Sequence, residues 1–153
     1  MQDQPKNDGM ERRMVHRMLM HWRSAQEGAG IPDFRDVLSR DLGDIYPCVY
    51  MLEIDEDIPD PFFERVGGAY ADEGGTSLVG HAVSEAPDNT LLGQAVKYFS
   101  RVQVKQIPIT LGGEFVHANG DTILYRSIIM PARDSEGVDR YLIGAANCKV
   151  KDA

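Results

Sequence analysis

The last third of the chain limits the fold most strongly, because it holds three apolar stretches separated by turn signals. The stretches run over residues 107–116, 122–130 and 141–148. The middle stretch alternates with a period of two residues, which is typical of a β-strand. The pair Asn119-Gly120 favours a two-residue type I′ turn before it. We therefore expect a three-stranded antiparallel meander at this end of the chain.

An earlier hairpin and several helices are expected before the meander. Residues 48–54 and 61–66 are rich in β-branched and aromatic side chains and flank an acidic loop, as in a β-hairpin. Residues 10–25 have apolar side chains at helical spacing, and a shorter helix follows Pro32. Short helical turns are expected in the glycine-rich segment 69–87. A helix is expected from about residue 89 to residue 101.

Size and charge fit one acidic domain. The chain has 153 residues and a net charge of −8, which disfavours a nucleic-acid partner because phosphate backbones are repelled. No apolar run approaches the roughly 18–20 residues that cross a bilayer, and no leader segment is evident, so we expect no membrane contact and a cytoplasmic location. We divide the chain into a disordered lead-in (1–9), an N-terminal amphipathic helix (10–30) and the main domain (31–153).

This order of elements resembles the PAS fold, and short motifs sharpen the resemblance. Motifs similar to those of bacterial stand-alone PAS proteins are Trp22 followed by Ile31-Pro32-Asp33-Phe34, then Arg65-Val66-Gly67-Gly68, Leu78-Val79-Gly80 and Arg126-Ser127-Ile128-Ile129-Met130-Pro131. The similarity covers about residues 20–150. It implies an α+β fold in which a five-stranded antiparallel sheet carries helices on one face, preceded by the N-terminal amphipathic helix.

The resemblance implies a sensory or docking module without catalytic machinery, so we expect no enzyme. Such a module binds a small ligand or a protein and takes part in signal transduction through a partner in trans. The methionine-rich stripe of helix 10–25 suits an adaptable protein–protein contact, and we expect a homodimer through this helix.

Five residues are candidates for ligand binding. Arg126 shares a strand face with apolar residues, so its guanidinium needs a carboxylate of the protein or an anionic ligand. His81 lies in the helical middle, where PAS proteins line their cavities, although a surface or capping role is the alternative. Tyr50, Phe63 and Tyr98 line a pocket or simply belong to the core.

We expect no cofactor and no metal. A haem-binding PAS domain would need an axial histidine in the helix before the third strand, and residues 89–101 contain none. Photosensing flavin domains carry a reactive cysteine in an Asn-Cys-Arg run on a central helix. Asn147-Cys148-Lys149 is similar in letters but ends the last expected strand. The sequence analysis therefore disfavours both haem and flavin.

Two other functions remain open at this stage. A small cone-shaped α+β enzyme would use a histidine and a carboxylate for acid–base chemistry, and His81 beside Asp72 or Glu85 in a deep pocket would favour it. A ligand-free adaptor with a filled core is the other alternative.

Overall fold

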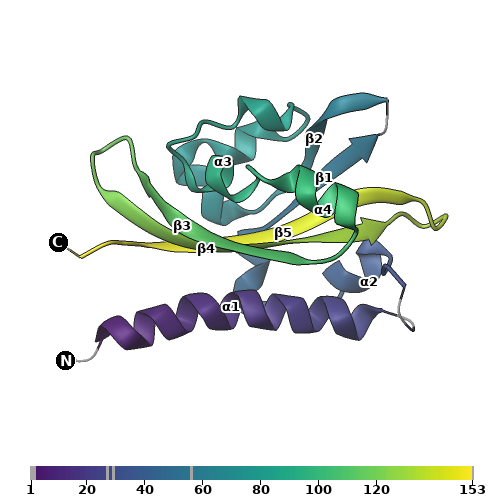
Figure 1. Ribbon diagram of the computed structural model, residues 1–153, viewed down its shortest axis with the longest axis horizontal. Coiled ribbons are helices and arrows are strands. Elements are labelled where there is room, and N and C mark those ends of the chain that lie inside the picture. The colour runs from purple at the N-terminus through teal and green to yellow at the C-terminus, as the bar shows by residue number, and fades with distance from the viewer. Residues whose placement is uncertain (1–2, 27, 29, 56, 153) are drawn as a thin grey trace.

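The fold is one five-stranded antiparallel sheet with helices on both faces (Figure 1). The computed structural model describes residues 3–26, 28, 30–55 and 57–152, without the side chains of residues 3–12 and 58. The strand order is β2-β1-β5-β4-β3, so the last strand lies at the centre and β2 and β3 form the edges. The early hairpin and the late meander thus join through β1 and β5.

The elements follow the expected order closely. The strands are β1 (Val49–Asp55), β2 (Ile58–Val66), β3 (Ile109–Val116), β4 (Thr122–Arg133) and β5 (Asp139–Val150). The α-helices are α1 (Asp3–Ala25), α2 (Phe34–Leu38), α3 (Leu91–Ala95) and α4 (Phe99–Lys105). Short 3-10 helices are η1 (Gly43–Cys48), η2 (Gly68–Glu73), η3 (Gly75–Leu78) and η4 (Val83–Glu85).

Three local expectations differ from the structure. Helix α1 already includes residues 3–9, where the sequence suggested a disordered lead-in. The helix expected over 89–101 is two helices, α3 and α4, separated by a turn at Val96–Tyr98. The expected type I′ turn is wrong, because Gly120 has a positive φ of 94° and Asn119 does not. The Asn119 side chain instead accepts a hydrogen bond from the Asp121 N–H at 2.9 Å, which shapes a longer loop.

The two faces of the sheet carry two separate cores. The inner face, under η2, α3 and α4, holds a cluster that includes Tyr50, Phe63 and Ile129. The outer face carries a second cluster formed with α1 and α2. Because strand residues alternate between the faces, neighbouring residues of β4 and β5 belong to different cores.

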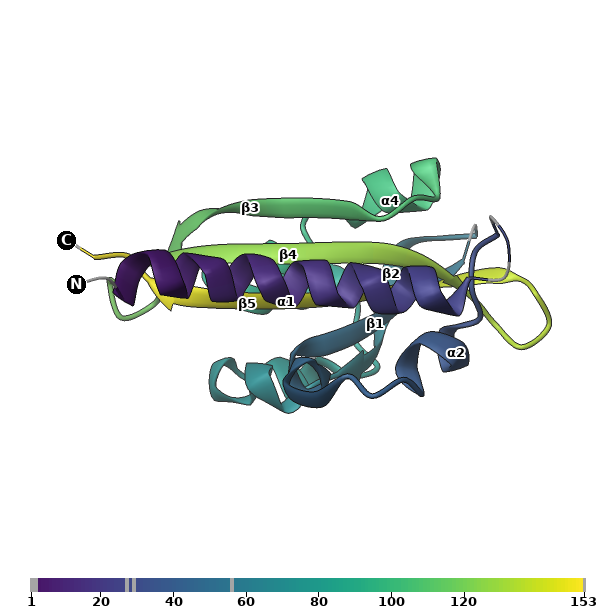
Figure 2. The same cartoon turned by 90° about the horizontal axis from the view of Figure 1, so that it is seen from below.

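Helix α1 lies along β4 and β5 on the outer face (Figure 2). Its methionine-rich stripe is buried there, with Met14 and Met18 packed against side chains of the sheet. These two methionines therefore contact the chain's own sheet, although the sequence suggested them as a partner surface. The Trp22 indole N–H donates a buried hydrogen bond of 2.8 Å to the Pro131 carbonyl.

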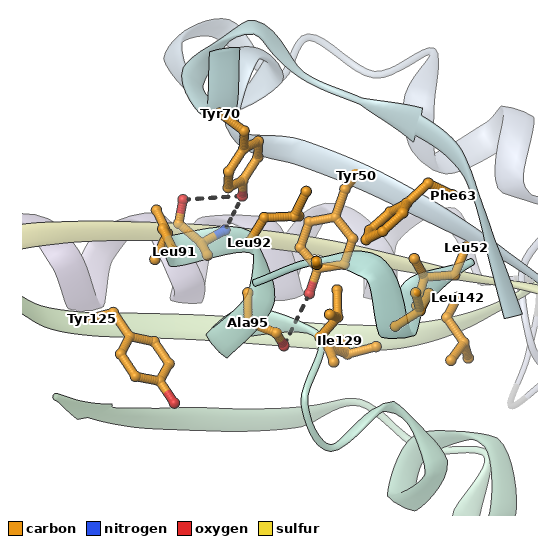
Figure 3. Close-up of a cluster of buried hydrophobic side chains, with 14 of the residues drawn as sticks. Tyr50, Leu52, Phe63, Tyr70, Leu91, Leu92, Ala95, Tyr125, Ile129 and Leu142 are labelled. Atoms are coloured by element: carbon orange, nitrogen blue, oxygen red, sulfur yellow. Dashed lines mark hydrogen bonds between the residues drawn. The ribbon is translucent and has the colours of Figure 1, made fainter. Parts of the chain in front are cut away.

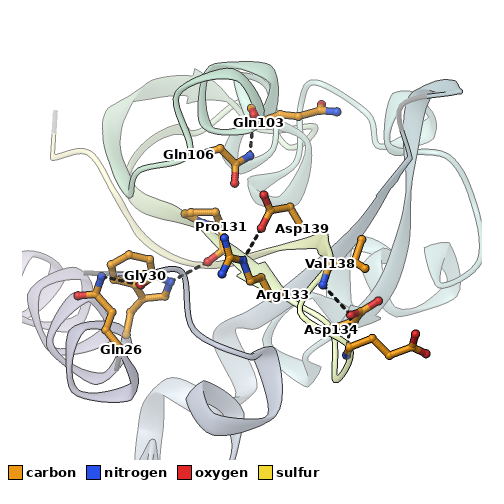
Figure 4. A network of polar contacts seen from close by, with 11 residues as sticks. Gln26, Gly30, Gln103, Gln106, Pro131, Arg133, Asp134, Val138 and Asp139 are labelled. Carbon is orange, nitrogen blue, oxygen red and sulfur yellow. Dashed lines mark hydrogen bonds and ion pairs between the residues drawn. The ribbon is translucent and has the colours of Figure 1, made fainter. Parts of the chain in front are cut away.

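The loop after α1 is fixed to the far end of β4 by polar contacts. The Arg133 N–H donates to the Pro32 carbonyl at 2.9 Å, and the Arg133 guanidinium pairs with Asp139 at 2.7 Å (Figure 4). The Gln26 amide donates to the Gly30 carbonyl at 3.0 Å. Two of the motifs that carry the family resemblance, at Trp22–Phe34 and Arg126–Pro131, thus meet at one junction.

In the part of the chain that the structure describes, no helix has the length and apolar character that crossing a bilayer requires.

Candidate functional site

The inner core is packed with large side chains between the sheet and the helices that cover it. Tyr50 from β1, Phe63 from β2, Leu92 from α3 and Ile129 from β4 are each almost fully buried (Figure 3). The Phe115 and Tyr125 rings extend this cluster toward the edge strand, at 6.0 Å between ring centroids. The inner face is therefore a continuous aromatic and aliphatic core.

Two buried tyrosines connect this core to the backbone. The Tyr70 hydroxyl donates to the Cys48 carbonyl at 2.6 Å and accepts from the Ala146 N–H at 3.2 Å. The Tyr50 hydroxyl donates to the Ala95 carbonyl at a longer 3.4 Å. Burial raises the pKa of both hydroxyls above the ordinary tyrosine value. Tyr70 therefore links the end of η1 to β5. Apart from its aromatic character, no feature of the sequence signals this role.

The structure separates the five candidate residues. Tyr50 and Phe63 share the inner core, whereas His81 and Tyr98 are exposed. The Tyr98 ring stacks with the guanidinium of Arg101, whose central carbon lies 4.4 Å from the ring centroid. Arg126 lies on the opposite, outer face of the sheet and is exposed. The expected burial of its guanidinium among apolar neighbours is wrong, because α1 covers the outer face beside Arg126 and leaves that side chain in solvent.

A histidine–carboxylate pair does exist at His81. Its Nδ1 atom lies 3.3 Å from Glu85 Oε1. Both side chains are about half exposed, at 54% and 53% of their accessible surface. Acid–base catalysis gains from a water-excluded pocket that tunes the pKa values of such a pair, and this pair lies on an open surface. Its geometry gives no support to the cone-shaped enzyme.

A second histidine–carboxylate pair is more enclosed and was not predicted. His117 Nε2 lies 2.8 Å from Glu73 Oε2, although the ring N–H is not aligned as a directed hydrogen bond. Glu73 Oε1 accepts from the Leu91 N–H at 3.0 Å. The pair therefore connects η2 and the start of α3 to the β3–β4 loop above the inner core.

A groove lies on the outer face between α1 and the edge strand β3. Its volume is about 300 Å³, and it is lined by Val15, His16, Leu19, Thr110, Leu111, Gly112 and Arg126. Its wall toward the helix is partly apolar, and Arg126 supplies a positive charge at its floor. This groove contains Arg126, one of the five candidate residues.

Buried polar atoms without a partner mark two positions in the sheet. Ser127 Oγ on the inner face and Asn147 Oδ1 on the outer face are buried and make no hydrogen bond. Ser127 is opposite Leu111 on β3, and Asn147 is opposite Arg126 on β4. Unsatisfied atoms of this kind are uncommon in native folds and mark places where a water molecule or ligand would be stabilised.

No family model and no curated protein matches this chain. Similar solved structures include the dark structure of the blue-light photoreceptor Aureochrome1 LOV, at 16% identity and a TM-score of 0.51, covering 82% of this chain and 90% of that one. The LOV domain of a blue-light activated histidine kinase from Erythrobacter litoralis has 16% identity and a TM-score of 0.47, with coverages of 67% and 95%. A light-oxygen-voltage domain studied with a flavin analogue has 17% identity and a TM-score of 0.44, with coverages of 65% and 76%.

These neighbours correct the expectation about flavin. The sequence analysis disfavoured a flavin, yet a solved structure with this fold is the blue-light photoreceptor domain Aureochrome1 LOV. The prediction against flavin is therefore wrong. A flavin ring presents carbonyl and N–H groups that need polar partners, and Ser127 Oγ is an unpartnered buried atom on the inner face of the sheet. The side chains of Tyr50 and Leu92 would have to move to admit such a ring.

The topology and the similarity to the Aureochrome1 LOV structure together show the fold. LOV domains are PAS-fold domains, and this chain shares their five-stranded antiparallel sheet with helices. An N-terminal helix is added on the outer face. The chain is a PAS-like domain.

Proposed function

We propose that the protein is a sensory or regulatory PAS-type module, without catalysis of its own, that signals to a partner protein in trans through helix α1. One observation carries this proposal: the central strands connect the inner core directly to the surface on which α1 lies. On β4, Ile129 belongs to the inner core, while its neighbours Ile128 and Met130 belong to the outer core under the helix.

This alternation supports a mechanical link between the two faces. A ligand or partner that shifts Ile129 or Leu142 on the inner face must also move the backbone of β4 or β5. The outer residues of the same strands would then shift beneath Met18 and Trp22 of α1. Packed interfaces respond to such shifts by moving between discrete arrangements, which a partner in trans can recognise.

The inner core is the proposed position for a small-molecule ligand. Its support is the pairing of an otherwise apolar cluster with one buried, unpartnered hydroxyl at Ser127. Such a combination suits a compact, mostly apolar molecule with one hydrogen-bonding group. Native mass spectrometry and a visible absorbance spectrum of freshly purified protein would identify a bound molecule, a flavin included.

A homodimer through α1 remains part of the proposal, with a different contact surface from the one first expected. The solvent face of the helix carries Met20, which is 46% exposed, among the exposed Arg13 and Arg23. An apolar side chain flanked by arginines is typical of interface positions. The acidic character of the whole chain, at −8, complements this basic helix face on a second copy.

Hydrogen exchange in α1 tests the proposed link without knowledge of the ligand. Leu92→Ala removes a buried side chain from the inner core and leaves the outer core untouched, so we expect faster exchange in α1 than the loss of global stability alone accounts for. Val104→Ala is the matched control, because Val104 is 83% exposed. If Leu92→Ala speeds exchange in α3 and leaves α1 at the wild-type rate, the proposed coupling is wrong.

A further inference from the structure

The groove between α1 and β3 holds an isolated positive charge beside an apolar wall. Arg126 has no ion pair and no hydrogen bond within residues 13–26, 28, 30–55 and 57–152. None of the described residues that line the groove carries a carboxylate. The chain has 24 acidic and 16 basic residues, so an arginine without an acidic partner is unusual in it.

The strand beneath Arg126 is shaped to hold the guanidinium in place. Arg126 is directly opposite Gly112 on the edge strand. A Cβ at Gly112 would lie 3.5 Å from the Arg126 Nη1 atom and 3.6 Å from its Cδ atom, so the Arg126 side chain passes at van der Waals distance beside this position. Arg126 therefore extends past Gly112 toward the edge strand and lines the groove together with Thr110.

A second, independent observation comes from the other neighbour of Arg126. Asn147 is opposite Arg126 on β5, and its Oδ1 atom is buried without a partner. Cross-strand side chains at directly opposite positions lie about 5 Å apart at Cβ. On the outer face, Arg126 thus lies beside a buried acceptor, and a bound water molecule can donate to that acceptor.

The apolar wall limits the kind of molecule that fits. Val15 and Leu19 on α1 form this wall. A volume of about 300 Å³ is at the small end of the range for ligand pockets. The groove therefore suits a molecule with one anionic group, which binds Arg126, and a short apolar tail, which lies along Leu19. His16 also lines the groove and offers a further polar group.

We propose that this groove binds a small amphiphilic carboxylate, with its head on Arg126 and its tail against α1. The site does not depend on the proposed signalling function, because it requires only the geometry of α1, β3 and β4. A molecule bound there contacts both the helix and the sheet, so it holds α1 on the outer face.

Calorimetric titration with octanoate tests the site, with octanol as the uncharged probe of the same tail. We expect wild-type protein to bind octanoate at least ten-fold more tightly than octanol. Arg126→Gln should abolish this difference, whereas Arg126→Lys should keep part of it, because a lysine retains the charge without the forked donors. Arg13→Gln is the matched control, since Arg13 is an exposed arginine of α1 outside the groove.

Leu19→Ala tests the contact of the apolar tail separately from the contact of the carboxylate head. It should weaken octanoate and octanol by a similar factor, because both lose the same apolar contact. Backbone NMR shifts on octanoate addition should centre on Thr110, Gly112 and Arg126.

The proposal is overturned if Arg126→Gln binds octanoate as wild type does, or if the shifts centre on Ile129 and Leu142 in the inner core. It is also overturned if a peptide with a C-terminal leucine binds the groove more tightly than octanoate does, or if dimer formation produces the same shifts without ligand.

Discussion

The Tyr50 ring lies across the backbone of Gly144, its directly opposite neighbour on the central strand β5. A Cβ atom at position 144 would overlap the Tyr50 ring itself. The glycine therefore admits a large aromatic ring to the inner core at the point where the early hairpin joins the late meander.

Gly144→Ala should lower the free energy of unfolding by about 2–3 kcal/mol, because the added methyl group overpacks the core against Tyr50. Urea unfolding measures this. Gly68→Ala is the control, because a Cβ there meets no atom within 4 Å and Gly68 has no positive φ. In a Tyr50→Ala background the cost of Gly144→Ala should nearly vanish, and an unchanged cost would show that another contact excludes the methyl group.

The buried tyrosine hydroxyls should make stability fall in alkaline solution. Burial raises the folded-state pKa of Tyr50 and Tyr70 above the ordinary value of about 10. A raised folded pKa means that the unfolded chain releases these protons first. The stabilisation is therefore complete below about pH 10 and is lost as the pH rises above it.

Urea titrations across this pH range test the prediction. Tyr70→Phe should reduce the slope of stability against pH above about pH 10, and at neutral pH it should cost roughly 1–3 kcal/mol, because the Ala146 N–H and Cys48 carbonyl lose a partner. Tyr46→Phe, at a residue that is 51% exposed, is the control at neutral pH. An unchanged slope in Tyr70→Phe would contradict the assignment.

The sequence predicted the architecture well where alternation and helical spacing were strong. The strand pattern around Ile128 and Ile129 predicted both the meander and the two faces of β4, and the amphipathic pattern around Met18 predicted α1. It could not show that the stripe of α1 packs on the chain's own sheet. The periodicity of a helix indicates that one of its faces is buried, but it does not identify the surface that covers this face.

The candidate site was less predictable, for a physical reason in each case. The sequence correctly predicted that Arg126 shares a strand face with apolar residues. Whether a residue on this face is buried depends on how far α1 extends across the sheet, and the strand pattern does not contain this information. The enclosed pair of Glu73 and His117 joins residues 44 positions apart, and no local pattern signals such a contact. The expectation against flavin failed because it rested on the position of one short motif, Asn147-Cys148-Lys149 at the end of the last strand, and not on the fold as a whole.

Removal of the outer helix should expose the outer core. A chain without residues 1–28 loses the side chains that cover Ile128, Met130 and Ile143, so we expect self-association or aggregation at concentrations where the full chain is well behaved. Size-exclusion chromatography with light scattering measures the mass of both chains. A truncated chain that stays folded and strictly monomeric would show that α1 is not needed to cover this face.

The dimer proposal has its own test on the intact chain. Met20→Asp places a charge on the solvent face of α1 without touching the buried stripe, so it should convert a dimer into a monomer at the same concentration. Val104→Asp is the control, since Val104 is more exposed and lies on α4. Equal masses for Met20→Asp and wild type would exclude this helix face as the contact.

The Glu73–His117 pair should control the closure of the β3–β4 loop over the inner core. Glu73→Ala removes the acceptor of the Leu91 N–H and the partner of His117 together. Hydrogen exchange should therefore accelerate at Leu91 and at Gly120 in the same variant.

Glu73→Gln keeps an oxygen for Leu91 and loses the charge, so it should accelerate exchange at Gly120 more than at Leu91. Glu85→Ala removes the exposed His81 partner and should change neither amide. Acceleration at Leu91 alone in Glu73→Ala would mean that the β3–β4 loop is held by its own hydrogen bonds, such as the 2.8 Å bond from the His117 N–H to the Asp121 carbonyl.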